Sequence, residues 1–176
     1  MIEMLTPLIE EEKEVLAGLL RRLKPPYGPK VFPAWVQNFI TTPVEMAVFN
    51  NDQQILLVHR EDSEYKGWHS PGTILRDEEN VPAALQRLIA GELGGAEVTK
   101  PVSLGWVEVP RGNGPGQNPT RHEISLLHAC WLYGTYKGGG SFFDSNNLPK
   151  ETLTHHKMVI IPEIFGRLSA KTIASF

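Results

Sequence analysis

The sequence predicts an α/β (α+β) fold, an α/β/α sandwich in which a mixed sheet lies between helices, with an added N-terminal helix. Two apolar segments at 44–48 and 54–60, joined by a polar turn at Asn50, predict a β-hairpin. Strands are also expected at 102–109 and within 123–136. Helices between these strands would cover both faces of the sheet, which is typical of a layered fold.

The N-terminal segment has a strong helical pattern between Pro7 and Lys24. Thr6 is suited to cap this helix, and acidic residues near its start and basic residues near its end favour it. An apolar stripe runs along it, formed by Leu8, Val15, Leu16, Leu19 and Leu23. The stripe needs a partner, either the main domain or a second subunit of a homodimer. The proline-rich segment at 25–29 ends the helix, so we expect an N-terminal helical extension at 1–30 and one main domain at 31–176.

Inside the main domain, Asn80 is expected to cap a helix that runs to about Leu93 and ends at Gly94. A loop is expected at 68–76. The segment at 111–120 contains three glycines, two prolines and no apolar side chain except proline, so it predicts a mobile surface loop. A C-terminal helix is expected at 157–168, interrupted by Pro162.

Composition narrows the classes of protein. The chain has 176 residues, of which 41% are hydrophobic, and this is enough for one domain with a sizeable core. A net charge of -3 gives no basic field for nucleic acid, and no apolar run is long enough to span a membrane. The single cysteine, Cys130, suits a reducing compartment, so we expect a cytoplasmic protein with no nucleic-acid or membrane partner.

The most informative segment is 72–95, where defined residues recur at fixed spacing. They are Pro71, Gly72, Glu79, Arg87, Glu92 and Gly94. Glycine permits a close backbone approach, and a helical carboxylate is a hard oxygen ligand for Mg²⁺ or Mn²⁺, which in turn binds phosphate. Leu88 lies four residues before Glu92 and is expected on the same helix face.

This segment resembles the Nudix box, the sequence motif of the Nudix hydrolases. In that family the box has a glycine, then a glutamate, and ends with Arg-Glu-x-x-Glu-Glu-x-Gly. Thr73, Leu88 and Gly91 replace the second glycine and two glutamates of that box. The resemblance implies that Glu79 and Arg87 form an ion pair between loop and helix. It also implies that Glu92, helped by the Gly72 carbonyl, binds one Mg²⁺ or Mn²⁺ ion.

The variant box is similar to that of GDP-mannose mannosyl hydrolase, which has Arg-Leu at the same place and keeps Glu-Leu-Gly. That resemblance implies a nucleotide sugar as substrate, cleaved by water at the sugar–phosphate bond. It also implies an arginine that braces the diphosphate, here Arg60, and a base after the 111–120 loop, here His122. Glu123 is the rival base and should point to the opposite face.

Two other functions are compatible with the same residues. A hydrolase could instead break the diphosphate bond of a nucleoside diphosphate-linked small molecule. The missing box glutamates could also mean that the site binds a nucleotide without turnover.

Overall fold

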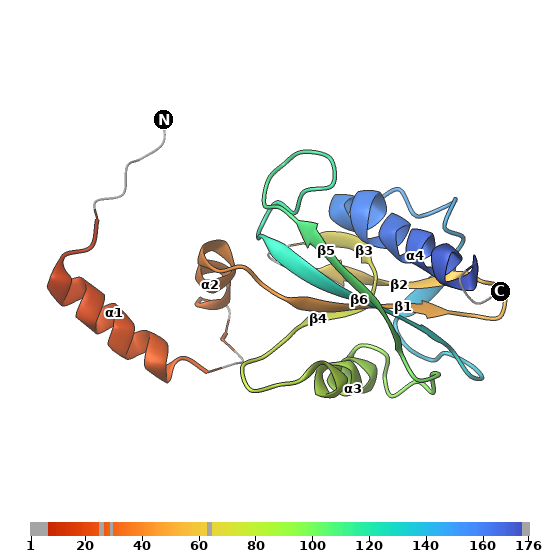
Figure 1. The fold of residues 1–176 in the computed structure, drawn as a ribbon, viewed down its shortest axis with the longest axis horizontal. Helices are drawn as coiled ribbons and strands as arrows, with labels where there is room; N and C mark the ends of the chain where they lie inside the picture. Colours follow the sequence, from red (N-terminus) through yellow and green to blue (C-terminus); the bar gives the residue numbers. More distant parts are fainter. Residues whose placement is uncertain (1–6, 25–26, 29, 63–64, 174–176) are drawn as a thin grey trace. The chain divides into compact units, whose positions relative to one another are not determined.

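The computed structural model describes residues 7–24, 27–28, 30–62 and 65–173 (Figure 1). Its contacts divide the chain into two units, 1–34 and 35–176. Within the described residues, no helix combines the length and apolar character needed to cross a membrane.

The first unit contains helix α1 (Glu10–Arg22), which is shorter than expected. The amide of Ile9 donates a 2.9 Å hydrogen bond to Glu12 Oε2, which caps the start of the helix. The predicted cap, Thr6, lies outside the described residues. A short helix that was not expected, α2 (Phe32–Asn38), follows.

The second unit is built on a seven-stranded sheet, counted over the described residues, with the order β3-β2-β1-β6-β5. Strand β4 also pairs with β1, and β7 pairs with β2. The pairing of β1 with β6 is parallel and the other pairings are antiparallel, so the sheet is mixed as predicted. The strands are β1 (Pro43–Phe49), β2 (Ile55–Glu61), β3 (Lys66–His69), β4 (Gly72–Ile74), β5 (Val102–Val109), β6 (Glu123–Trp131) and β7 (Gly140–Phe143).

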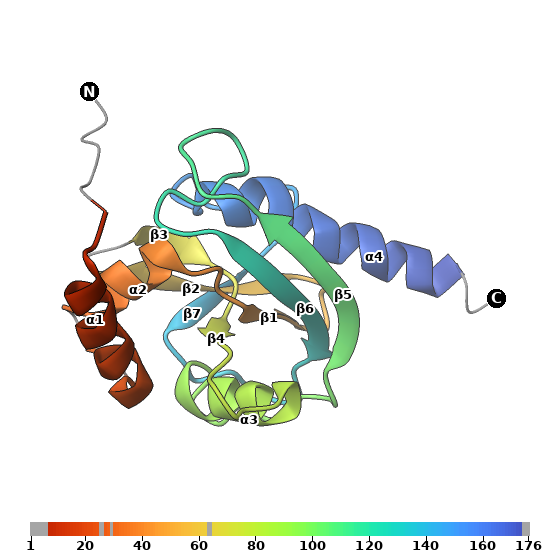
Figure 2. The ribbon, with the colours of Figure 1, turned by 60° about the vertical axis from the view of Figure 1, so that its left-hand side comes forward.

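Helices cover both faces of this sheet (Figures 1 and 2). Helix α3 (Val81–Gly91) packs on one face, and π-helix η1 (His156–Ile160) with α4 (Ile161–Ile173) packs on the other. Each face has its own apolar core, centred on Met46 for α3 and on Leu127 for α4. All seven residues of β1 are buried because this strand lies between the two cores. The predicted sandwich is therefore confirmed.

Several local expectations were wrong. The segment 68–76 contains parts of strands β3 and β4, not only a loop, and strand β7, which begins at Gly140, was not predicted. Strand β6 ends at Trp131, inside the 123–136 segment where a strand was expected, and the chain beyond it turns at Gly134 with φ of 70°. Pro162 does not interrupt the C-terminal helix, because it lies in the first turn of α4 after the π-helix.

The loop at 111–120 is anchored, although its composition predicted a mobile segment. The Gly112 amide donates to the Asn118 carbonyl at 2.9 Å, and the Asn118 amide donates to the Pro110 carbonyl at 3.0 Å. Asn118 is fully buried, and its side-chain oxygen accepts a 2.7 Å hydrogen bond from the Tyr65 hydroxyl. A buried polar side chain needs such partners, so Asn118 ties the loop to the domain.

Candidate active site

The turn at Gly72 brings the two predicted metal ligands together. Gly72 opens β4, and the antiparallel pairing with β1 places it opposite Glu45. Helix α3 ends one residue before Glu92, and Glu92 Oε2 accepts a 3.1 Å hydrogen bond from the Gly72 amide. Gly94 then takes a left-handed conformation, with φ of 61°, which turns the chain away from the helix.

Glu79 and Arg87 form an ion pair, and we call this pair and its contacts with β4 the clamp. Arg87 Nε and Nη2 donate to the two carboxylate oxygens of Glu79 at 2.8 and 2.7 Å. The same guanidinium donates to Thr73 Oγ1 at 2.5 Å and to the Ile74 carbonyl at 3.0 Å. Hydrogen bonds from Arg87 lower the pKa of Glu79 to about 2. The clamp thus holds β4 against the first turns of α3.

The two helical positions without a glutamate have different surroundings. Leu88 is 1% exposed and packs in the core between α3 and the sheet, so it does not line the surface that Glu92 occupies. Gly91 is the last residue of α3, and a Cβ there would meet no atom within 4 Å. Leu88 therefore contributes to the fold, whereas the space beside Gly91 is open.

Glu45 was missed by the sequence reasoning, although it is a carboxylate inside the apolar strand β1. Its side chain occupies the space beside Gly72: a Cβ at Gly72 would lie 2.7 and 2.8 Å from the two oxygens of Glu45. Real Cβ atoms do not approach so closely, so residue 72 must be glycine while Glu45 keeps this position. Glu45 is 6% exposed, and Ser70 Oγ lies 2.8 Å from its Oε2.

Burial is the main reason why the pKa of Glu45 lies well above its usual range, and repulsion from Glu123 adds to it. The hydrogen bond from Ser70 and the nearby Arg121 lower the same pKa, whereas Glu92 raises it. Glu45 therefore interacts with two carboxylates from other parts of the chain, Glu92 beside Gly72 and Glu123 at the start of β6, and we call Glu45, Glu92 and Glu123 the carboxylate cluster.

Glu123 begins β6 and is 4% exposed. Arg121 Nε lies 2.7 Å from Glu123 Oε1, and the side chains are 8% and 5% exposed respectively. A buried guanidinium at this distance favours the charged form of the carboxylate. The structure therefore places one of the two predicted bases, Glu123, in the cluster.

Arg60 lies in β2, and its Nε is paired with Asp62. Its positive charge lowers the pKa of Glu92, although burial has the larger effect and raises it overall. The guanidinium groups of Arg60 and Arg121 lie 5.0 and 5.1 Å from the centre of the Tyr65 ring. Two cations are thus held near the carboxylate cluster.

His122, the other predicted base, is not brought into the cluster. Its Nε2 lies 2.8 Å from Glu108 Oε1, and the two side chains are 36% and 55% exposed. Because neighbouring residues of an extended chain point to opposite sides, His122 and the buried Glu123 face different surroundings, as the sequence predicted.

Three buried histidines, His69, His155 and His156, connect to Glu45 through Ser70. The rings of His69 and His155 are 5.6 and 4.5 Å from that of His156, and His156 Nδ1 lies 3.0 Å from Ser70 Oγ. Burial lowers the pKa of His69 to about 4 and that of His155 to about 3, and it also lowers the pKa of His156. These imidazoles are therefore neutral near pH 7 and supply hydrogen bonds rather than charge.

A divalent ion would fit this site only with help from a substrate. Across the part of the chain that the structure describes, no three His, Cys, Asp or Glu side chains are grouped so that they could hold an ion. Glu92 and the Gly72 carbonyl offer the hard oxygen ligands that Mg²⁺ prefers, and burial is the main reason why the pKa of Glu92 is raised. Phosphate oxygens and water would have to complete the coordination.

Comparison with known proteins identifies the family. The NUDIX domain model matches residues 41–157. The chain belongs to the NUDIX domain family. The ADP-ribose pyrophosphatase of Methanocaldococcus jannaschii is 31% identical over 119 residues, which span 64% of this chain and 67% of that relative. The chain is thus a Nudix hydrolase family member, as the spacing of the box predicted.

Two solved structures show the same fold at low sequence identity. The NUDIX domain of Shewanella oneidensis NrtR, complexed with ADP ribose, has a TM-score of 0.58 and 18% identity, covering 89% of this chain and 98% of that one. A MutT NUDIX hydrolase from Burkholderia pseudomallei has a TM-score of 0.57 and 21% identity, covering 71% of this chain and 97% of that one.

Proposed function

We propose that this Nudix hydrolase cleaves the diphosphate of a nucleoside diphosphate linked to a sugar, with ADP-ribose as the first substrate to test. The observation that carries the proposal is the hydrogen bond between the Gly72 amide and Glu92 beside the buried Glu45, together with the Arg121–Glu123 ion pair whose charges act on Glu45. Carboxylates for a metal ion and guanidinium groups for phosphate oxygens are the chemistry that a diphosphate requires. The ADP-ribose pyrophosphatase relative and the NrtR domain bound to ADP ribose support this class of substrate.

One Mg²⁺ or Mn²⁺ ion would be held by Glu92 and the Gly72 carbonyl. When bound, such an ion neutralises charge on the diphosphate oxygens and on the departing phosphate. Arg60 and Arg121 would add positive charge on the other side of the substrate. The single buried thiol, Cys130, whose pKa burial raises to about 12, is consistent with action in the cytoplasm.

Glu123 is the base that we assign to the reaction. Glu45 is buried and favours its neutral form, whereas Glu123 has a guanidinium partner, Arg121, at 2.7 Å. Two carboxyl groups in such different surroundings suit acid and base roles. Water attacks phosphorus while Glu123 accepts its proton, a new phosphorus–oxygen bond forms, and the bridging bond breaks with its electron pair on the departing phosphate.

A second candidate is cleavage of the sugar–phosphate bond of a nucleotide sugar such as GDP-mannose. The Leu88 and Glu92 pattern of the box favours it, because that pattern leaves few carboxylates on the helix. The products formed from each substrate distinguish the two reactions. We expect ADP-ribose to give AMP and ribose 5-phosphate, whereas GDP and free mannose from GDP-mannose would support the second candidate.

The deciding experiment follows these products by chromatography in Mg²⁺ and in Mn²⁺, for the native protein and for Glu92→Gln. The amide of glutamine still accepts the Gly72 hydrogen bond but carries no charge, so we expect activity to fall about 100-fold without loss of folding. ADP-ribose binding measured by calorimetry, with no product in either ion, would instead mean that the domain only binds nucleotides.

A further inference from the structure

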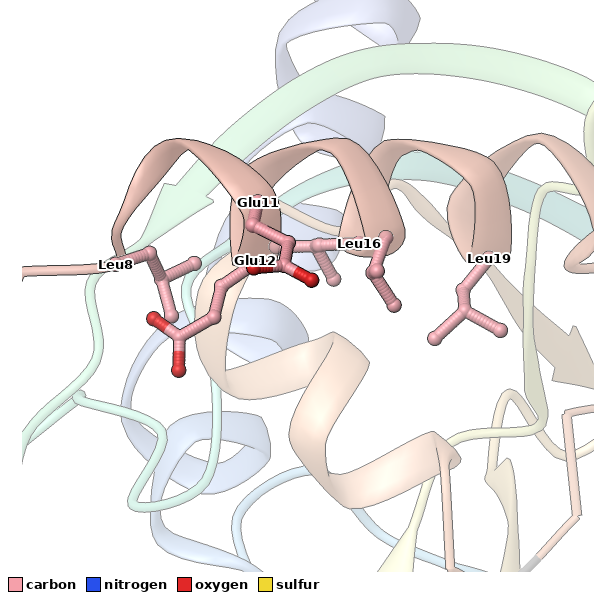
Figure 3. A pocket seen from close by; sticks show the side chains of 6 residues that line it. Leu8, Glu11, Glu12, Leu16 and Leu19 are labelled. Atoms are coloured by element: carbon pink, nitrogen blue, oxygen red, sulfur yellow. The ribbon is translucent and has the colours of Figure 1, made fainter.

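Helix α1 carries an apolar surface that its own unit does not cover. Within the described helix no residue is buried, and Val15 and Leu19 are 59% and 56% exposed. Figure 3 shows the side chains of Leu8, Leu16 and Leu19 on one side of the helix. With two glutamates they line a hollow of about 330 Å³, formed by Leu8, Glu11, Glu12, Val15, Leu16 and Leu19. We call this surface the α1 stripe.

The charges of α1 are divided between its two ends. Glu10, Glu11 and Glu12 occupy the first turn, and Arg21 and Arg22 occupy the last. Glu11 and Arg22 are eleven residues apart, which is about three helical turns, so both border the same edge of the α1 stripe at opposite ends. Arg21, one residue away from Arg22, points about 100° further round the helix and away from the stripe.

The acidic first turn of one α1 helix is complementary in charge to the basic last turn of a second α1 helix that runs in the opposite direction. If two copies of α1 pack antiparallel about a two-fold axis near the middle of the helix, Glu11 of each copy lies beside Arg22 of the other. A parallel pair would instead place two acidic turns side by side. Antiparallel packing also opposes the two helix dipoles, which is favourable.

We propose that the α1 stripe is covered by α1 of a second copy of this chain, in an antiparallel and symmetric pair. A closed two-fold contact of this kind uses the same surface on both subunits, so it needs only one patch in the sequence. The 13 residues of α1 make a helix about 20 Å long. A pair of helices of this length offers less contact than the roughly 1,000 Å² of a stable interface, so the dimer is expected to be a transient one.

Charge reversal in the full-length chain tests this proposal. Glu11→Arg would place two guanidinium groups together, one of them that of Arg22 in the second copy, and Arg22→Glu would place two carboxylates together. We expect each variant alone to weaken self-association about tenfold in analytical ultracentrifugation. An equimolar mixture of the two variants should restore association, because a mixed dimer pairs opposite charges again. Arg21→Glu is the matched control and should leave the dissociation constant within about twofold.

The equimolar mixture of the two variants shows which partner covers the α1 stripe. If α1 packs on its own chain, the native protein stays monomeric at about 100 μM and mixing the variants changes nothing, which overturns the proposal. Capture of a different protein would also leave the purified chain monomeric. Because α1 is outside the carboxylate cluster, hydrolysis should be equal in all variants and confirms that each is folded.

Discussion

Two glutamates near the Gly72 turn, Glu79 of the clamp and Glu45, lie in opposite surroundings. Glu79 forms an ion pair with Arg87, and the pKa of Glu79 falls to about 2. Glu45 lies in a buried strand near two other carboxylates, and the pKa of Glu45 rises. The ion pair of Glu79 stabilises the fold, whereas the burial of Glu45 near other carboxylates costs the folded state free energy. This contrast is what a stabilising contact beside a functional one should show.

The largest effect should come from Gly72→Ala, which forces a methyl group into the space of the Glu45 carboxylate. We expect destabilisation of about 1–3 kcal/mol and loss of most hydrolysis. Thermal unfolding and product formation measure the two effects. Combining it with Glu45→Ala removes the steric conflict, so stability should return without activity. If Gly72→Ala alone keeps native activity, Glu45 does not occupy this space during the reaction.

Breaking the clamp tests the stabilising half of the comparison. Glu79→Gln should lower stability by about 1 kcal/mol near pH 7, because the ion pair with Arg87 is only partly exposed. The folded pKa is about 2 and the unfolded value about 4.5, so the native advantage exists above about pH 4.5 and is lost as pH falls towards 2. Thermal midpoints of both proteins between about pH 7 and 3 should therefore converge on acidification.

Glu45→Gln should change stability in the opposite direction from Glu79→Gln and raise it near pH 7. A raised folded pKa favours folding only below the unfolded value of 4.5, and this contribution is lost as pH rises through the folded pKa. Near pH 7 the amide should therefore be more stable than the carboxyl group, by about 1 kcal/mol, and this gain should vanish below about pH 4.5. A lower midpoint at neutral pH would show that Glu45 is charged and stabilising.

The smallest effect is expected for His122→Ala, because this side chain is partly exposed and paired with Glu108. We expect hydrolysis within about twofold of the native rate, whereas Glu123→Gln should lower it about 100-fold. Rates for both variants under the same conditions decide between the two bases. A large loss for His122→Ala with native activity for Glu123→Gln would reverse the assignment.

Local sequence was sufficient wherever the interacting residues lie on adjacent elements. The resemblance to the Nudix box predicted the ion pair of Glu79 with Arg87 and a shared site for Glu92 and Gly72, and the structure contains both contacts. Alternating and helical periodicity likewise located β1, β2, β5 and α3, because each buries one or two continuous faces. Short strands such as β7 were missed because four residues carry too little periodicity.

Tertiary structure decided the rest of the site. Glu45, Ser70, Arg121, Glu123 and His156 come from segments that are far apart in the sequence, and the parallel pairing of β1 with β6 puts Glu45 and Glu123 on neighbouring strands. No spacing rule connects such residues, because their distances depend on strand order and on the π-helix that positions His156. The sequence by itself determined the family, and its resemblance to the Nudix box predicted the clamp and placed Glu92 near Gly72. Only the packing of the sheet determined which carboxylates lie near Glu92, because burial and charge arise from residues that meet in space.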